Sequence, residues 1–241
     1  MMRALRAYVR TQQFDPGIVG LLVNPFYHAR RGLYCAIRKA GLRMKGSLLD
    51  VGCGRKPYQA LFQADEYIGL EIDTPENRLQ KNADYYYDGE SFPFSPGRFD
   101  GVICNQVLEH VFAPDRFLAE IRRVLCPGGQ LLLTVPFVWD EHEQPWDYAR
   151  YSTFGLKSLL ERNGFEIIEQ CKINADVRTI FQLINAYLYK ILWTRGPVLN
   201  LLICVLFMAP ANILGALLHR LLPENPDLYL DQLVLARKAG E

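Results

Sequence analysis

The chain has 241 residues, half of them hydrophobic, and its 27 Lys and Arg against 26 Asp and Glu give a formal net charge of +1. This length allows one elaborated domain or at most two, with enough apolar residues for a substantial core. The six cysteines are widely spaced and form no Cys-x-x-Cys or Cys/His zinc pattern, which argues against a disulfide framework and a structural metal and favours a reducing compartment. Residues 1–10 are basic but no apolar segment follows, so we expect no secretory signal.

The small net charge conceals a strong asymmetry along the chain. Residues 1–47 carry nine basic residues and one acid, whereas residues 48–172 carry twelve basic residues and twenty acids. A basic N-terminal arm of this kind is either a solvated helix face or a segment that seeks phosphate, on nucleic acid or on anionic lipid.

The predicted elements alternate between helices and strands. Asn24-Pro25 and the apolar spacing after it predict a helix that ends at Gly41, and buried strands follow as the chain proceeds. We expect strands at 47–52, 67–71, 85–87, 99–104, 130–136, 165–172 and 229–237. The helices between them are expected at 57–62, from Thr74, at 114–125 and at 152–163, with a turn at Pro127-Gly128-Gly129. Such alternation predicts a mostly parallel sheet covered by helices on both faces.

An apolar insertion of about fifty residues precedes the last predicted strand. Gly196 to Leu218 contains no charged residue, a length that could cross a bilayer. Pro210 is expected to interrupt it, and the return of the chain to the sheet favours a broken helical hairpin that lies in one leaflet over a single span. Membrane contact through 177–222 is the interpretation we favour, because the basic arm would add attraction to anionic lipid. A protein-covered helical pair, or a dimer interface, stays the alternative.

The motif Asp50-Val51-Gly52-Cys53-Gly54 follows the first predicted strand. Glycines there allow a ligand to approach the backbone closely, as in nucleotide-binding turns at the carboxyl ends of parallel strands. Pro57 stands where a dinucleotide fingerprint would place its third glycine, and no Gly-Lys-Ser/Thr follows. The alternative at this point is a tight turn without a ligand.

Four further motifs follow this turn in order along the chain. They are Tyr67-Ile68-Gly69-Leu70-Glu71, Asp88-Gly89-Glu90-Ser91-Phe92-Pro93-Phe94, Gln106-Val107-Leu108-Glu109-His110-Val111 and Arg123-Val124-Leu125-Cys126-Pro127-Gly128-Gly129. The succession resembles the class I S-adenosylmethionine-dependent methyltransferases, in the group often called type 11, over residues 46–170. The resemblance implies a Rossmann-like seven-stranded sheet, with the apolar helical insertion before its last strand.

The resemblance also implies which positions would hold S-adenosylmethionine and its product S-adenosylhomocysteine. Asp50 would lie near the ammonium group, Glu71 would bind the ribose, and Asp88 would accept from the adenine amine. Acids suit a donor that carries a sulfonium and an ammonium group. The whole expected set is Asp50, Gly52, Cys53, Gly54, Glu71, Ile72, Asp88, Gly89, Asn105 and Gln106.

The segment Pro136–Ser152 follows the fifth strand, at the sheet edge where an acceptor would bind. It resembles a subgroup of these enzymes with a His…Pro…Asp-Tyr…Arg-Tyr-Ser loop, some of them associated with glycan or envelope biosynthesis. His142 is a candidate general base for a hydroxyl, with bracing of the loop as the alternative. The candidate substrate residues are Trp139, Asp147, Tyr148 and Arg150. Glu109 and His110 are interpreted as packing groups first and site residues second.

These observations predict four segments: a basic helical arm (1–46), the methyltransferase core (47–173), the apolar insertion (174–226) and the last strand with the tail (227–241). We expect methyl transfer to an oxygen or nitrogen of a small, glycan or lipid-linked acceptor, with no metal, in the cytoplasm or at the inner face of the membrane. A homo-oligomer stays open. The alternatives are a non-catalytic cofactor-binding or scaffold protein, and a nucleic-acid methyltransferase, which we consider weaker because its Asn/Asp-Pro-Pro-Tyr/Phe signature is absent.

Overall fold

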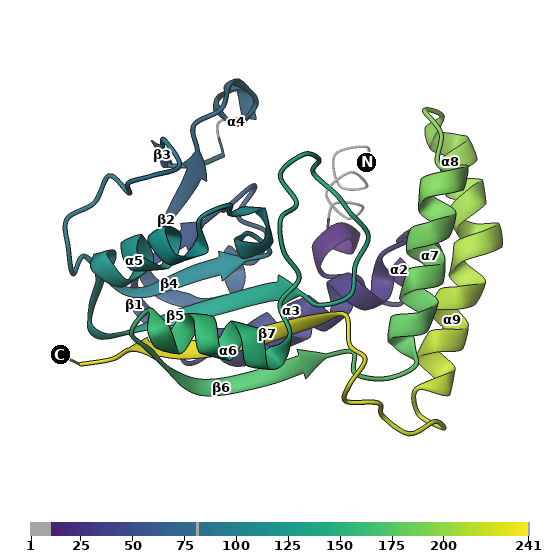
Figure 1. Ribbon diagram of the computed structural model, residues 1–241. Helices are drawn as coiled ribbons and strands as arrows, with labels where there is room; N and C mark the ends of the chain where they lie inside the picture. Colours follow the sequence, from purple (N-terminus) through teal and green to yellow (C-terminus); the bar gives the residue numbers. More distant parts are fainter. Residues whose placement is uncertain (1–10, 81, 241) are drawn as a thin grey trace. The chain divides into compact units, whose positions relative to one another are not determined.

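A computed structural model describes residues 11–80 and 82–240 (Figure 1). Residues 1–10, the start of the expected basic arm, therefore lie outside the described part of the chain. The chain forms two compact units. Among the described residues, the sheet unit comprises 37–80, 82–137, 141–171 and 232–240, and the helical unit comprises 11–36, 138–140 and 172–231.

The elements follow the predicted alternation. The strands are β1 (Lys45–Val51), β2 (Gln63–Ile72), β3 (Tyr85–Tyr87), β4 (Phe99–Asn105), β5 (Leu125–Pro136), β6 (Phe165–Ile173) and β7 (Asp231–Lys238). The helices from the N-terminus to β6 are α2 (Gly20–Val23), α3 (Tyr27–Gly41), η1 (Gln59–Leu61), α4 (Pro75–Gln80), η2 (Leu108–His110), α5 (Pro114–Val124) and α6 (Thr153–Arg162). After β6 come α7 (Arg178–Leu192), α8 (Pro197–Ile203), the π-helical turn η3 (Cys204–Met208) and α9 (Ala209–Leu218).

The seven strands form one sheet in the order β3-β2-β1-β4-β5-β7-β6. The β3–β2, β2–β1, β1–β4 and β4–β5 pairs are parallel, so the carboxyl ends of β1, β2 and β4 meet at one edge of the sheet. From β1 the chain adds strands first on one side, as β2 and β3, and then on the other side, as β4 and β5, so the order across the sheet reverses between β1 and β4. In open α/β sheets, ligands bind outside the carboxyl ends at such a reversal.

The last strand runs against its neighbour. The side chain of Gln170 donates to Gln232 at 2.9 Å, and Ala239 donates its backbone N–H to Gly164 at 3.0 Å, so the end of β7 meets the start of β6. Figure 1 shows β7 and β6 as arrows of opposite direction. The sheet is therefore mixed, and the predicted Rossmann-like seven-stranded architecture is confirmed.

The core of the sheet unit forms where α5 and α6 cover the strands. Phe117, Leu118 and Ile121 of α5 and Leu156 and Leu160 of α6 are buried against apolar strand residues. Each helix begins as the sequence predicts: Pro114 occupies the first turn of α5, and the Ser152 hydroxyl accepts the N–H of Gly155 at 3.2 Å.

Two local predictions for the sheet unit were wrong. Pro127–Gly129, expected as a turn before the strand, lies within β5, because the register to β4 shifts between Phe99 and Gly101 and accommodates this segment. The helix expected at 57–62 is a single 3-10 turn, Gln59–Leu61, because Leu61 and Phe62 donate their N–H groups to carbonyls three residues earlier.

The helical unit contains the predicted hairpin, in which α7 packs along α9. Pro210 does not break the second helix, which continues from Pro197 to Leu218. The π-helical turn η3 ends two residues before Pro210, where the hydrogen-bond pattern is already shifted and the missing proline N–H is tolerated.

Candidate active site

The loop after β1 is shaped for close approach to its backbone. Gly52 has φ +69, and a Cβ at this residue would lie 2.3 Å from Cγ2 of Val107. Its N–H donates to the carbonyl of Leu70 at 2.9 Å, which anchors the loop to β2. Only glycine fits both the conformation and the space, so the turn is built around the Gly-x-Gly motif.

Asp50 is the buried acid of this loop. Its carboxylate accepts a 2.7 Å hydrogen bond from the hydroxyl of Tyr67, and its exposed fraction is 6%. Burial raises the pKa of Asp50 to about 7, although the Tyr67 hydrogen bond opposes this. A cation bound beside Asp50 would favour the ionised form, so the site fits a ligand with an ammonium group.

Glu71, at the end of β2, connects the strand to the glycine loop. Its carboxylate accepts the N–H of Gly54 at 2.9 Å. Burial raises the pKa of Glu71, and the nearby charge of Glu143 raises it further. Because Glu143 belongs to the segment after β5, this effect indicates that the segment lies near the end of β2.

The remaining predicted cofactor residues lie at the ends of β3 and β4. Asp88 accepts the N–H groups of Glu90 and Ser91, which fixes a turn, and these bonds lower its pKa. At the end of β4, Asn105 accepts a 2.7 Å hydrogen bond from the hydroxyl of Thr134. Gln106 follows with φ +56. The fold thus places all the predicted strand-end groups on one edge, whereas their contacts with a cofactor stay predictions.

Asp147 organises the segment after β5. One of its oxygens accepts the N–H of His142 at 3.0 Å and lies 3.3 Å from Nδ1 of the same residue. Arg150 donates to both oxygens of Asp147 at 2.5 and 2.7 Å. The Arg150 hydrogen bonds lower the pKa of Asp147 to about 2, so this carboxylate stays charged at neutral pH. The negative charge favours a proton on Nδ1 of His142 and a basic Nε2.

The turn η2 is tied to the same segment. The backbone carbonyl of Glu109 accepts the N–H groups of Tyr148 and Ala149 at 2.8 and 3.2 Å. Nδ1 of His110 lies 2.9 Å from the carbonyl of Trp146. A carbonyl only accepts, so Nδ1 of His110 carries the proton and its Nε2 is left basic when the ring is neutral.

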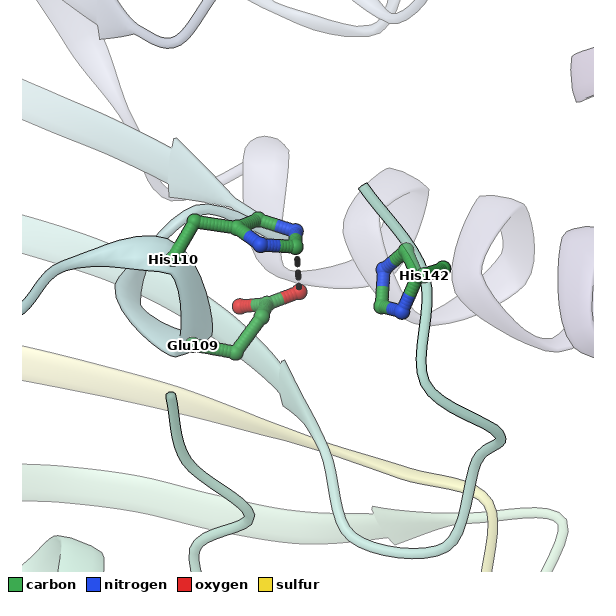
Figure 2. A group of neighbouring side chains, drawn as sticks. All are labelled: Glu109, His110 and His142. Carbon is green, nitrogen blue, oxygen red and sulfur yellow. Dashed lines mark ion pairs between the residues drawn. The ribbon is translucent and has the colours of Figure 1, made fainter. Parts of the chain in front are cut away.

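Glu109, His110 and His142 form one cluster (Figure 2). Nε2 of His110 lies 3.9 Å from the fully buried Glu109 carboxylate, and the two imidazole rings are T-shaped with centroids 4.8 Å apart. Donor atoms of the three residues lie within 4.8 Å of one another, so a divalent cation could bind after a small inward movement of the side chains.

Three of the predicted substrate residues belong to the same unit as His142, and the fourth belongs to the other unit. Asp147, Tyr148 and Arg150 belong to the sheet unit with His142, and the Tyr148 ring packs on Phe112 at 5.3 Å. Trp139 belongs to the helical unit, where its ring lies 5.8 Å from that of Phe26. Glu109 and His110, interpreted first as packing groups, directly adjoin His142. Their place after β4, on the same edge as the segment after β5, was the signal in the sequence.

Residues 26–170 match a family model described as a methyltransferase domain. The chain belongs to this methyltransferase family. Class I methyltransferases use S-adenosylmethionine as the methyl donor. The predicted enzyme class and its cofactor are therefore confirmed at the level of the family. The acid-lined edge with its glycine turn agrees with such a cofactor.

Curated relatives of this methyltransferase match over part of their length. An uncharacterized methyltransferase of Mycobacterium sp. strain KMS is 36% identical over 100 residues, which is 39% of each chain. A malonyl-[acyl-carrier protein] O-methyltransferase of Erwinia pyrifoliae is 32% identical over 94 residues, 36% of each chain. The chain thus spans about two fifths of the length of these relatives.

Solved structures share the fold at low sequence identity. The [4+2]-cyclase SpnF has a TM-score of 0.54 at 22% identity, with 89% of this chain and 83% of that chain covered. A phosphoethanolamine N-methyltransferase 2 of Haemonchus contortus, in complex with S-adenosyl-L-methionine, has a TM-score of 0.56 at 18% identity, with 95% and 59% covered. At this identity the likeness supports the fold alone.

Proposed function

We propose that this methyltransferase transfers a methyl group from S-adenosylmethionine to a hydroxyl oxygen, with His142 as the general base. The observation that carries the proposal is the Asp147 carboxylate 3.3 Å from Nδ1 of His142. A carboxylate in this position orients an imidazole and stabilises its cationic form, as in other base–orienter pairs.

A hydroxyl acceptor needs a base because the oxygen loses its proton during the transfer. When bound, S-adenosylmethionine supplies an electrophilic methyl group. In the transfer an O–C bond would form as the S–C bond of the donor broke, and Nε2 of His142 would take the hydroxyl proton. Positioned bases of this kind contribute typically about 10²–10⁴-fold to rate. The protein otherwise contributes mainly alignment of the two reactants.

The neighbours of His142 suit the imidazolium that this step forms. The Asp147 carboxylate places a negative charge beside His142, and the buried Glu109 carboxyl group belongs to the same cluster. Arg150 balances Asp147 and holds it in place. His110 lies edge to face with His142 and is itself fixed through Trp146. We therefore assign His110 and Arg150 positioning roles.

We further propose that the acceptor is a glycan or lipid-linked molecule that the enzyme meets at the cytoplasmic face of a membrane. The uncharged stretch from Gly196 to Leu218 supports this proposal. Among the relatives, the Erwinia pyrifoliae enzyme is named an O-methyltransferase, which supports oxygen as the atom methylated.

The proposal is tested by incubating the protein with trideuteromethyl-labelled S-adenosylmethionine and a bacterial extract divided into membrane-lipid, glycan and water-soluble fractions. We expect mass spectrometry to find the labelled methyl on an oxygen of one compound, in the lipid or glycan fraction. Label on a nitrogen, or in nucleic acid, would contradict the proposed acceptor.

The matched variants are His142→Asn and, in the same segment, Gln144→Ala at an exposed position. We expect His142→Asn to lower labelling about 10²-fold or more while S-adenosylhomocysteine binding, measured by calorimetry, is unchanged. Gln144→Ala should behave as the wild type. Binding without labelling of any fraction would favour the non-catalytic alternative.

A further inference from the structure

The hairpin of the helical unit has its polar residues inside and its large apolar residues outside. Thr179, Gln182 and Asn185 of α7, and Asn212 of α9, each have an exposed fraction of 0%. Four large apolar residues of α7 are instead exposed, at spacings of three or four residues: Ile180, Ile184, Tyr187 and Ile191. This spacing places them along one stripe of the helix.

The second helix shows the same inversion. Its ten exposed large apolar residues are Val198, Leu199, Leu201, Leu202, Val205, Leu206, Phe207, Ile213, Leu214 and Leu217. Together with the four on α7 they form what we call the apolar face. The largest exposed apolar patch on a typical soluble monomer covers roughly 300–600 Å². Fourteen exposed large apolar side chains on two paired helices are more than such a patch usually contains, and they indicate an interaction surface.

The buried polar residues show that one flank of the hairpin is committed to protein. Asn212 donates to the carbonyls of Leu21 and Asn24 at 3.1 and 2.9 Å, and its side-chain oxygen accepts from Asn185 at 2.9 Å. Gln182 donates to the carbonyl of Pro25 at 3.0 Å and accepts the N–H of Ala29 at 3.2 Å. A helix fixed in this way would leave buried amides without partners if it separated from α2 and α3 to enter a bilayer alone.

The helix from Pro197 to Leu218 is long and apolar enough to cross a membrane, with a mean hydropathy of 2.4 over its most apolar window. Its packing suits a different position, parallel to the membrane plane with only the apolar face in lipid. The residues at both ends of the helix fit this position. Exposed Arg195 precedes the helix, with Trp193 two residues before it, and exposed Arg220 follows the helix. Aromatic and basic side chains of this kind lie at the level of lipid headgroups.

Charge decides between a lipid surface and a second copy of the chain. Residues 177–222 contain Arg178, Lys190, Arg195 and Arg220 and no acid, but Arg178 and Lys190 form ion pairs with Asp176 and Asp140. The charges that decide are therefore Arg195 and Arg220, at the two ends of the helix. Two copies paired through the apolar face, parallel or antiparallel, would bring these basic ends together. Anionic lipid instead attracts each exposed basic residue by about 1 kcal/mol. We propose that the apolar face docks, without spanning, on a membrane surface that contains anionic lipid.

This inference does not depend on the proposed reaction, and its test needs neither donor nor acceptor. The full chain is floated with vesicles of phosphatidylcholine alone and with vesicles that also contain phosphatidylglycerol. We expect binding to both and stronger binding to the anionic vesicles, with the difference reduced by salt. Failure to float with either kind of vesicle would overturn the proposal.

Matched variants locate the surface. Leu202→Gln combined with Leu206→Gln should lower vesicle binding about tenfold or more, whereas Leu79→Gln, at an 82% exposed position of the sheet unit, should not. Arg195→Glu with Arg220→Glu should remove the preference for anionic vesicles. Near-ultraviolet circular dichroism checks that each variant is folded. A lipid-free dimer in analytical ultracentrifugation that the Leu202/Leu206 variant dissociates would instead assign the face to a second copy.

Discussion

The hydroxyl of Tyr67 donates a 2.7 Å hydrogen bond to the buried carboxylate of Asp50, at the base of the glycine loop. Burial nevertheless raises the pKa of Asp50 to about 7, which places its titration within the physiological range. The pair therefore controls whether the loop offers a negative charge to a bound cation.

The first prediction concerns the affinity for S-adenosylhomocysteine as a function of pH. Below about pH 7 Asp50 is protonated in the free protein, and binding the cationic ligand then requires Asp50 to lose its proton. The affinity should therefore fall by up to about tenfold for each pH unit below about 7. The fall should stop where the free energy needed to ionise Asp50 exceeds the free energy that its charge contributes to binding. Tyr67→Phe removes the bond that lowers the pKa and should move this fall to higher pH. Asp50→Asn should abolish it. Calorimetric affinities of the Asp50→Asn protein that follow the wild-type pH curve would contradict the assignment.

The second prediction concerns acid stability. Asp147 has its pKa lowered to about 2 by Arg150, from an ordinary value of 3.8. It therefore contributes stability that is complete above about pH 4 and is lost as pH falls toward 2, roughly 2 kcal/mol in all. In urea denaturation, the free energy of unfolding of Asp147→Asn should fall less between pH 4 and pH 2 than that of the wild type. An equally steep loss in that variant would show that other carboxylates carry the effect.

The third prediction concerns the glycine turn. Gly52→Ala should weaken S-adenosylhomocysteine binding about tenfold or more, because the new methyl group meets Val107 and φ +69 becomes strained. Gly128→Ala is the control, with φ +75 and no atom within 4 Å of the added Cβ. It should lower the melting temperature by strain alone and leave binding unchanged. Equal binding by the Gly52→Ala protein would remove the turn from the cofactor site.

The fourth prediction separates a base from a metal centre. If Nε2 of His142 accepts the proton, a chelator such as EDTA should leave the methyl-transfer rate unchanged. Added Zn²⁺ should inhibit, because the Glu109, His110 and His142 donors lie close enough to capture it. His110→Ala should weaken that inhibition. If chelation abolished activity and an added metal restored it, the assignment of His142 as a base would be wrong. The three residues would then be assigned to a metal that binds the acceptor.

Much of the fold follows from local sequence signals. Apolar runs that end in Gly, Asp or Asn identify the parallel strands, and Pro114 and Ser152 mark the starts of α5 and α6. The edge that carries Asp50 and Glu71 is predictable for the same reason, because carboxyl ends of parallel strands meet at one edge.

The rest depends on contacts between residues distant in sequence. The cluster of Glu109 and His110 with His142 forms because the backbone carbonyls of Glu109 and Trp146 bind groups across the two segments. No local pattern reports those bonds. The outward apolar face could not be predicted either, because hydropathy does not show that the side chain of Asn185 donates to that of Asn212 inside the hairpin.

The central claim is that His142, held by Asp147, removes the acceptor proton. Its most direct test is the pH dependence of single-turnover methyl transfer to the identified acceptor, for the wild type and His142→Asn. We predict a wild-type rate that rises with pH as the base loses its proton, and a variant that is about 10²-fold or more slower at neutral pH without that rise. An unchanged rate and pH profile in His142→Asn would contradict this claim.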